Sequence, residues 1–428
     1  MQGGVNVLLY TTIGDIIRKY RERANLSITQ LANLSGLSKG AVSKIERGDT
    51  KRPEMHTIKA IKNVLEIPYQ EIVEHYITVE ERVDVLLDLL SEAIHFSDAA
   101  LASKVAAKFL VSSREDTYSL LERLYDFTAN VEHTQFRLLL YNTITKYARD
   151  RGIPQYIARG LLQTYLIERD DFSKLSQTYQ KGKEIVNYAH FLPVNERILM
   201  YYKLGVHAYN LGLFDDCISL CKNVVEEDKT ESKIKVDATI AIYNCYYYLG
   251  DYESTEYYLN ICSKYSLPYV KEEVKLMQAV LRGKKGDVDT AIDELEHFVE
   301  SAGDNTILHV ANLLLELYLQ RKRLAEIKEL LRHEERINKV PLRTPYKKTE
   351  MARFIKQKGD YYLLKGKYDD AIDHYLNSAL EYGKVNEHEK GYETINHIVG
   401  HFIKNEENMN LEVLKKLQKV YNILSKEK

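Results

Sequence analysis

Four residues between Ser38 and Lys44 have types and a spacing that suit contact with a nucleic acid. Lys39 and Lys44 can donate hydrogen bonds to guanine O6 and N7 or to phosphate oxygens, and Ser43 adds a hydroxyl group. Gly40 has no side chain and therefore allows a close approach of the backbone. If these residues begin a helix, its first turns can contact base edges in the major groove of DNA. We therefore predict DNA contacts from Ser38, Lys39, Gly40, Ser43 and Lys44.

The surrounding segment, residues 28–47, has the pattern of two short helices joined by a tight turn. Ser27 and Gln30 have the spacing of a capping box, Gly36 stands at the turn, and Ser38 can cap the second helix. The buried face of the pair is predicted to contain Leu31, Ala32, Leu37, Val42 and Ile45. This combination is typical of a DNA-binding helix-turn-helix. The alternative interpretation is an ordinary helical hairpin.

The charge of the chain is unevenly distributed. Residues 1–68 hold 11 Lys and Arg against 6 Asp and Glu, whereas the whole chain of 428 residues holds 60 against 62. Residues 1–12 lack helical periodicity, and we expect them to form a flexible arm. Residues 13–68 are predicted to form a compact helical head. A basic head on an acidic body is compatible with nucleic acid at one end and a protein or peptide partner at the other.

The rest of the chain is predicted to be a helical repeat array. Only 7 prolines and 20 glycines occur, and long segments repeat with a helical period. Residues 69–95 are predicted to be a helical connector, with one helix continuing from Tyr69 to about Leu90. Residues 96–428 then contain repeated turns at Gly212, Gly250, Gly286 and Gly366, with the spacing of tetratricopeptide (TPR) repeats. The predicted fold is therefore all-α, with a lambda-repressor-like helix-turn-helix domain followed by a right-handed TPR superhelix of seven to nine helix pairs.

A TPR superhelix has a concave face lined by the first helix of each pair, and this face is the expected ligand site. Asparagine side chains can both donate to and accept from the main chain of an extended peptide. Projecting the repeat register predicts that peptide-binding residues include Asn210, Asn244, Tyr247, His309, Asn312 and Glu316. The alternative is a set of solvated polar groups on an empty face.

The sequence lacks the motifs of several common enzymes. It contains no GxxxxGK[ST], HExxH, GxSxG or CxxC motif, so we predict no catalytic residues and no enzyme activity. Cys217 and Cys221 have no second ligand pair at a zinc-like spacing, which favours buried packing thiols. We therefore expect no metal and no cofactor. No run of 18 apolar residues occurs and no signal-peptide core is found, so we expect a cytoplasmic protein with no membrane partner.

The head resembles the Xre/lambda-repressor-like DNA-binding family through the segment RKYRERANLSITQLANLSGLSKGAVSKIERG. The resemblance implies that Glu46 pairs inward with Arg21 and does not face DNA. The family usually places a glutamine at the start of its second helix, whereas this chain has Ile28 there. Thr29 and Gln30 are therefore the expected DNA contacts from that helix.

The whole layout resembles the Gram-positive peptide-pheromone receptors called RRNPP, and most closely their neutral-protease transcriptional regulators. The resemblance implies a quorum-sensing regulator that binds double-stranded DNA at paired half-sites, as a homodimer or higher oligomer, and is gated by a short signalling peptide. Activation of transcription is the expected direction. The alternative implied by the same resemblance is a Rap-like docking protein that binds a response regulator and promotes its dephosphorylation.

Overall fold

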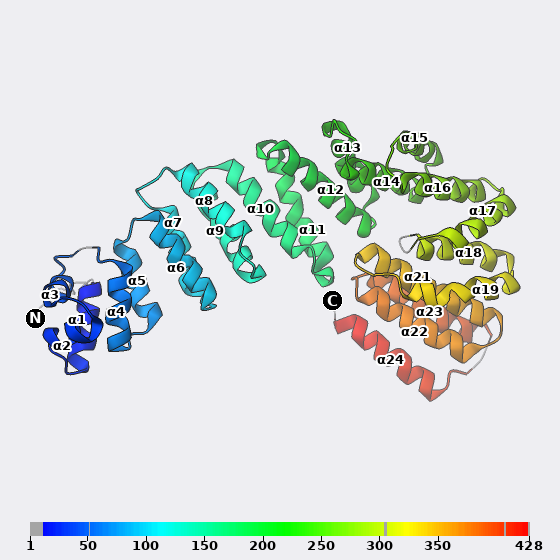
Figure 1. The fold of residues 1–428 in the computed structure, drawn as a ribbon. Coiled ribbons are helices and arrows are strands. Elements are labelled where there is room, and N and C mark those ends of the chain that lie inside the picture. Colours follow the sequence, from blue (N-terminus) through cyan, green and yellow to red (C-terminus); the bar gives the residue numbers. More distant parts are fainter. Residues whose placement is uncertain (1–11, 51, 304–305, 406–407, 427–428) are drawn as a thin grey trace, which may run out of the picture. The chain divides into compact units, whose positions relative to one another are not determined.

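The computed structural model describes residues 12–50, 52–303, 306–405 and 408–426 (Figure 1). All regular elements within these ranges are helices, which confirms the all-α prediction. The predicted arm, residues 1–12, lies outside the described residues except for Thr12, which caps the first helix. No described helix combines the length and the apolar character needed to cross a bilayer.

Contacts divide the chain into two compact units, Met1–Ile167 and Glu168–Lys428. The first unit holds α1 (Ile13–Arg23), α2 (Ile28–Ser35), α3 (Lys39–Glu46), α4 (Met55–Leu65), α5 (Tyr69–Val79), α6 (Val83–His95), α7 (Ala99–Leu110), α8 (Thr117–Ala129), α9 (Thr134–Arg151) and nearly all of α10 (Pro154–Glu168). The boundaries expected at residues 68 and 95 fall inside this unit and remain predictions.

The second unit consists largely of successive helix pairs. Its elements are η1 (Phe172–Lys174), α11 (Leu175–Lys183), η2 (Glu184–Phe191), α12 (Val194–Asn210), α13 (Phe214–Glu227), α14 (Lys233–Tyr248), α15 (Tyr252–Cys262), α16 (Val270–Lys284), α17 (Val288–Ser301), α18 (Ile307–Arg321), α19 (Leu324–Leu330), η3 (Leu331–His333), α20 (Glu334–Asn338), α21 (Pro345–Leu364), α22 (Tyr368–Gly383), α23 (His388–Lys404) and α24 (Leu411–Lys426).

The local signals of the helix-turn-helix are found where the sequence predicts them. The Ser27 hydroxyl accepts from Gln30 N–H, and the Gln30 side chain accepts from Ser27 N–H at 2.8 Å. Gly36 has φ = 69°, which ends α2 in the left-handed region. Four predicted core residues are buried, whereas Leu37 is half-buried; the buried ones are Leu31, Ala32, Val42 and Ile45.

The prediction of one continuous helix from Tyr69 to Leu90 is wrong, because the helix is interrupted between the end of α5 at Val79 and the start of α6 at Val83. The buried Glu80 carboxylate accepts from the backbone N–H groups of Glu81 at 2.9 Å and Arg82 at 2.8 Å. Both N–H groups belong to residues that lie between α5 and α6, so the side chain satisfies backbone donors that would otherwise be left open in the break. The Arg82 guanidinium binds Glu80 at 2.7 Å and also contacts Glu54, the residue before α4. The break is therefore tied to the head by charged contacts.

The repeats of the second unit pack through small residues. A Cβ atom on Gly205 would lie 2.6 Å from the Cys221 sulfur, so α12 and α13 approach at this glycine. The turn predicted at Gly212 follows α12, and Gly212 adopts the left-handed backbone conformation there, with φ = 71°. The four cysteines are free and buried, as expected for packing thiols; they are Cys217, Cys221, Cys245 and Cys262.

Candidate DNA-binding and peptide-binding sites

The predicted DNA contacts lie on the outer side of α2 and α3. Ser43 is half-buried, and the other predicted contacts are exposed, namely Thr29, Gln30, Ser38, Lys39, Gly40 and Lys44. Lys39 and Lys44 make no side-chain hydrogen bond or ion pair with any residue in the described ranges. A Cβ atom at Gly40 would meet nothing within 4 Å. The surface is therefore open, and its two lysines are available to a ligand.

Two of the predicted contacts also hold their own helices in place. The Gln30 side chain closes the capping box with Ser27, and the Ser38 hydroxyl accepts from Ala41 N–H at 3.1 Å. N-capping hydrogen bonds of this kind stabilise a helix by about 1 kcal/mol. Substituting Gln30 or Ser38 would therefore change helix stability as well as any DNA contact, and Lys39 and Lys44 report on binding more directly.

Behind this surface, Glu46 and Arg21 form the buried ion pair that the family resemblance implies. Arg21 Nε donates to Glu46 Oε1 at 2.7 Å, and Nη2 donates to Oε2 at 2.9 Å. The hydrogen bonds with Glu46 raise the pKa of Arg21, although burial opposes the shift. Arg18 Nη2 also donates to the Glu46 carbonyl at 2.6 Å. Glu46 therefore holds α1 against the end of α3 and does not face outward, as predicted.

A second feature that positions α3 was missed by sequence reasoning. Gly14 in α1 is buried, and a Cβ atom there would lie 2.4 Å from the carbonyl oxygen of Ile45. Helices can approach this closely only where a side chain is absent. Its signal in the sequence is a glycine at the second position of a predicted helix, where glycine is otherwise unfavourable.

In the second unit, three neighbouring cavities form one candidate groove. Cavity A, of about 290 Å³, is lined from α12, α14, α16 and α18 and from the start of α21. Cavity B, of about 340 Å³, shares Asn244 and His309 with it. Cavity C, of about 330 Å³, shares Tyr209, Asn210 and Tyr346 with cavity A. Since the cavities share walls, we treat them as the subsites of one groove.

Most predicted peptide-binding residues meet in this groove. Five of the six line it, namely Asn210, Asn244, Tyr247, His309 and Glu316. Asn312 does not, because its side chain is fully buried and donates to the Glu350 carbonyl at 2.8 Å and to Glu350 Oε2 at 3.0 Å. The structure therefore places Asn312 within the wall between α18 and α21, where it does not line the cavities.

Glu350 is the centre of a charged cluster that sequence reasoning missed. Its carboxylate lies 3.0 Å from His309 Nδ1 and 3.7 Å from Arg353 Nη1, and it also receives the Asn312 bond. Burial raises the pKa of Glu350, but these hydrogen bonds and charges outweigh burial and lower it to about 2. Arg353 also contacts Glu316. The cluster joins α18 to α21, and no short-range pattern in the sequence predicts it.

Aromatic rings separate the cavities. The Tyr346 ring lies 5.7 Å from that of Tyr209, and its hydroxyl is 3.1 Å from His309 Nδ1. Phe214 and Tyr248 stack at 5.3 Å with an interplanar angle of 8°. Burial raises the pKa of Tyr209 and Tyr346 well above the ordinary value for tyrosine, so both hydroxyls stay neutral hydrogen-bonding groups.

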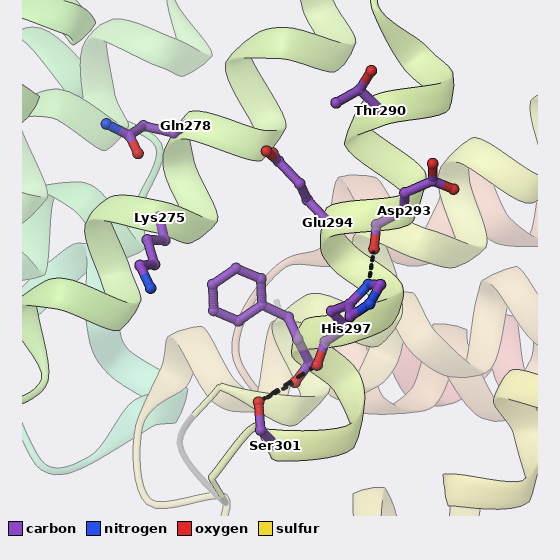
Figure 2. Close-up of a pocket in the computed structure, with 8 residues that line it drawn as sticks. Lys275, Gln278, Thr290, Asp293, Glu294, His297 and Ser301 are labelled. Carbon is purple, nitrogen blue, oxygen red and sulfur yellow. Dashed lines mark hydrogen bonds between the residues drawn. The ribbon is translucent and has the colours of Figure 1, made fainter.

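A larger hollow lies elsewhere, between α16 and α17, with a volume of about 610 Å³ (Figure 2). Figure 2 shows the His297 ring bonded to the Asp293 carbonyl at 2.7 Å, one turn earlier in the same helix. Glu294 is paired with Arg282 at 3.0 Å. The hollow contains none of the predicted binding residues, and these polar groups are already satisfied, so the groove is the better candidate site.

Comparisons with known proteins identify the class of the head. Residues 17–72 match the helix-turn-helix family model, which confirms the predicted helix-turn-helix. The HTH-type transcriptional regulator SlrR of Bacillus subtilis (strain 168) is 41% identical over 71 residues, which are 17% of this chain and 47% of SlrR. The HTH-type transcriptional repressor RghR of the same organism is 36% identical over 70 residues, 16% of this chain and 52% of RghR. The chain thus spans about half the length of the curated relatives it matches.

Solved structures align with most of the chain at low similarity. Selenomethionine phAimR is 12% identical, with a TM-score of 0.37, and the match covers 95% of this chain and all of phAimR. Bacillus thuringiensis PlcR, in complex with the peptide PapR7 and DNA, is 15% identical with a TM-score of 0.23, and 90% of this chain and 99% of PlcR are covered. TM-scores this low do not establish a common arrangement of the helices.

Proposed function

We propose that this chain is a transcriptional regulator whose helix-turn-helix head binds paired DNA half-sites and whose groove binds a short signalling peptide. The observation that carries the proposal is the convergence of Asn210, Asn244 and His309 on three joined cavities, in a chain that also has an open helix-turn-helix surface. A peptide in extended conformation exposes main-chain donors and acceptors that amide side chains can match.

The proposal also includes the oligomeric state of the chain and the direction in which it regulates transcription. Paired half-sites require two heads, so the chain is proposed to act as a homodimer or higher oligomer. The helices that line the groove are proposed to exchange between two arrangements, and the peptide binds one of them more tightly. The balance between the arrangements shifts only as far as this difference in peptide affinity allows. We propose that this shift changes operator binding and that the bound state activates transcription. These features are also the ones implied by the resemblance to peptide-pheromone receptors.

The peptide part is tested by mass spectrometry of small peptides that co-purify with the full chain. A synthetic copy of a retained peptide is then added during operator binding, measured by fluorescence anisotropy and sedimentation. The expected result is a change in affinity or stoichiometry at saturating peptide. Unchanged affinity and stoichiometry would refute peptide gating while leaving DNA binding intact.

The DNA part is tested with Lys39→Ala, with Lys264→Ala as a control because Lys264 is exposed in the second unit. If Lys39 contacts phosphate, binding weakens equally on all sequences and the slope of log K against log salt falls by about 1. If Lys39 contacts a base, discrimination at one position is lost, by about 1–3 kcal/mol. Equal binding by both variants would remove Lys39 from the interface.

Gly40→Ala separates folding from binding at the same surface. The space around Gly40 is open, so alanine should stabilise α3 by up to about 1 kcal/mol. If the backbone lies against DNA at this point, the added methyl group weakens operator binding although the head becomes more stable. Improved stability with unchanged operator affinity would show that Gly40 is not at the interface.

A further inference from the structure

Cavity A differs from the rest of the groove in its charge. Its described lining includes two carboxylates, Asp237 and Glu273, and no lysine or arginine. Much of the remaining lining is apolar, with side chains from α14 and α16 such as Ile240, Leu276 and Met277. An apolar wall strengthens the field of a carboxylate because few water dipoles screen it.

The carboxylates of the neighbouring cavities are matched by cations. In cavity B, Glu316 contacts Arg353 and lies 3.6 Å from Lys284 Nζ. In cavity C, Glu387 is 3.1 Å from Lys390 Nζ. Within the part of the chain that the structure describes, the excess of negative charge in the groove is therefore concentrated in cavity A.

The two carboxylates of cavity A are held differently. Asp237 accepts from the Tyr269 hydroxyl at 2.6 Å and from the Tyr202 hydroxyl at 3.3 Å. Glu273 has no hydrogen bond or ion pair among the described residues, although the adjacent Glu272 accepts from Thr306 at 2.8 Å. Glu273 is half-buried, and a carboxylate that is partly removed from water without a partner gains from a cation that binds beside it.

The electrostatics of Glu273 agree with this geometry. Burial raises the pKa of Glu273, the charges of Glu272 and Asp237 raise it further, and His309 opposes them. A bound cation would reverse this shift, because an opposite charge nearby favours the ionised form.

A second observation among the residues that line cavity A points independently to a ligand. The Asn210 Nδ2 group donates to the Val206 carbonyl at 2.8 Å, but Asn210 Oδ1 is buried without a partner among the described residues. Asn210 lines both cavity A and cavity C. A buried amide oxygen in this position can accept from a main-chain N–H group of a ligand that occupies the groove.

We propose that cavity A binds a positively charged group of the peptide, with Glu273 as its main partner and Asp237 adding negative charge. The group is an arginine or lysine side chain or the N-terminal ammonium, because these are the cations a peptide carries. Asn210 then binds the adjacent main chain. The inference rests on the proposed peptide-binding function and adds the chemical class of the ligand.

The test uses the full chain, immobilised, and a pool of random hexapeptides with amidated C-termini. Arginine and its uncharged isostere citrulline are equally frequent in the pool, lysine and histidine are omitted, and half of the peptides are N-acetylated. Mass spectrometry of the retained fraction measures two ratios, arginine to citrulline and free to acetylated N-termini. We expect at least a fivefold enrichment in one of them, and the ratio that changes identifies the source of the cation.

Variants assign the effect to cavity A. Glu273→Gln keeps the shape of the side chain and should return the enriched ratio to near one, and Asp237→Asn should reduce it less. Glu294→Gln removes the same charge from the outer hollow of Figure 2 and should leave the ratio unchanged. Circular dichroism melting verifies that each variant is folded.

The outcomes separate this inference from the proposed function. If the pool is retained but both ratios stay near one, the cation subsite is wrong and peptide binding stands. An equal loss of enrichment in Glu294→Gln would also overturn the subsite, because the effect would then come from net charge. If no peptide is retained by the folded wild-type chain, both proposals fail.

Discussion

The head and the groove each depend on a buried glutamate, and the two are held in different ways. Glu46 is paired with two guanidinium groups, that of Arg21 at 2.7 Å and that of Arg18 at 3.9 Å, and lies behind the proposed DNA-binding surface. Glu350 is held by His309, Asn312 and Arg353, and Glu350 itself lines cavity C. The ion pair of the head therefore lies apart from the proposed binding surface, whereas in the groove His309, Glu350 and Arg353 both hold the wall and line the cavities. Mutations should reveal this difference.

The largest effect is expected at Glu46. Glu46→Ala leaves the Arg21 guanidinium buried without its carboxylate, and breaking a buried pair in this way costs about 3–5 kcal/mol. Hydrogen-exchange mass spectrometry should show loss of protection in α1 and α3. Glu22→Ala is the control, because it removes an exposed carboxylate 3.7 Å from the same Arg21, and a surface pair of this kind contributes less than about 1 kcal/mol. Persistent protection of α1 in Glu46→Ala would show that the pair does not support the head.

The next largest effect is the loss of stability at low pH that we expect from Glu350 in the wall of the groove. The pKa of Glu350 is about 2 in the folded chain, against an ordinary value of 4.5. A lowered pKa stabilises the fold above pH 4.5, and this contribution is lost as the pH falls from 4.5 towards 2. The shift corresponds to at most about 3 kcal/mol. Urea unfolding followed by circular dichroism should therefore give a difference between wild type and Glu350→Gln that shrinks across this range.

Glu389→Gln is the control for the acid experiment, because Glu389 is exposed and its substitution should leave the pH profile of wild type unchanged. If the difference in unfolding free energy between wild type and Glu350→Gln stays constant from pH 5 to pH 2, the ionised form of Glu350 does not stabilise the fold.

Glycine substitutions compare the packing of the two regions. Gly14→Ala places a methyl group against the Ile45 carbonyl, and a backbone atom cannot rotate away, so the head should lose about 2 kcal/mol. Gly359→Ala in α21 instead meets the Tyr375 ring at 2.8 Å, and a side chain can partly adjust. Thermal unfolding should show a smaller loss for Gly359→Ala. The reverse order would contradict the close approach of α1 to α3.

The smallest effect is expected for an asparagine that lines the groove. Asn244→Ala removes one hydrogen-bonding amide from cavities A and B and should lower peptide affinity about tenfold, with little change in unfolding. Asn312→Ala should instead lower the unfolding temperature, because it removes the hydrogen bonds from Asn312 to Glu350 that hold the wall between α18 and α21. Asn260→Ala, on the exposed side of α15, is the control for both. Calorimetric titration and thermal unfolding, measured together, separate the two asparagines.

Much of the head could be predicted from the sequence because its signals are local. The capping box of Ser27 and Gln30, the turn at Gly36 and the periodic core each involve residues a few positions apart. The continuous connector helix was predicted wrongly, because α5 ends at Val79 and the buried Glu80 carboxylate satisfies the N–H groups of the two residues before α6. Periodicity alone does not detect such a side chain, since the apolar pattern continues on both sides of the break.

The sequence by itself determined that the chain is helical, that it begins with a helix-turn-helix and that repeated helix pairs follow, because these features depend on short-range spacing. It also indicated five residues that line the groove, through the repeat register. Only the tertiary structure decided that Asn312 is part of the wall, that Glu350 joins α18 to α21, and that Glu273 has no partner in cavity A. These properties depend on contacts between residues tens of positions apart, and the packing of helices on one another sets such contacts.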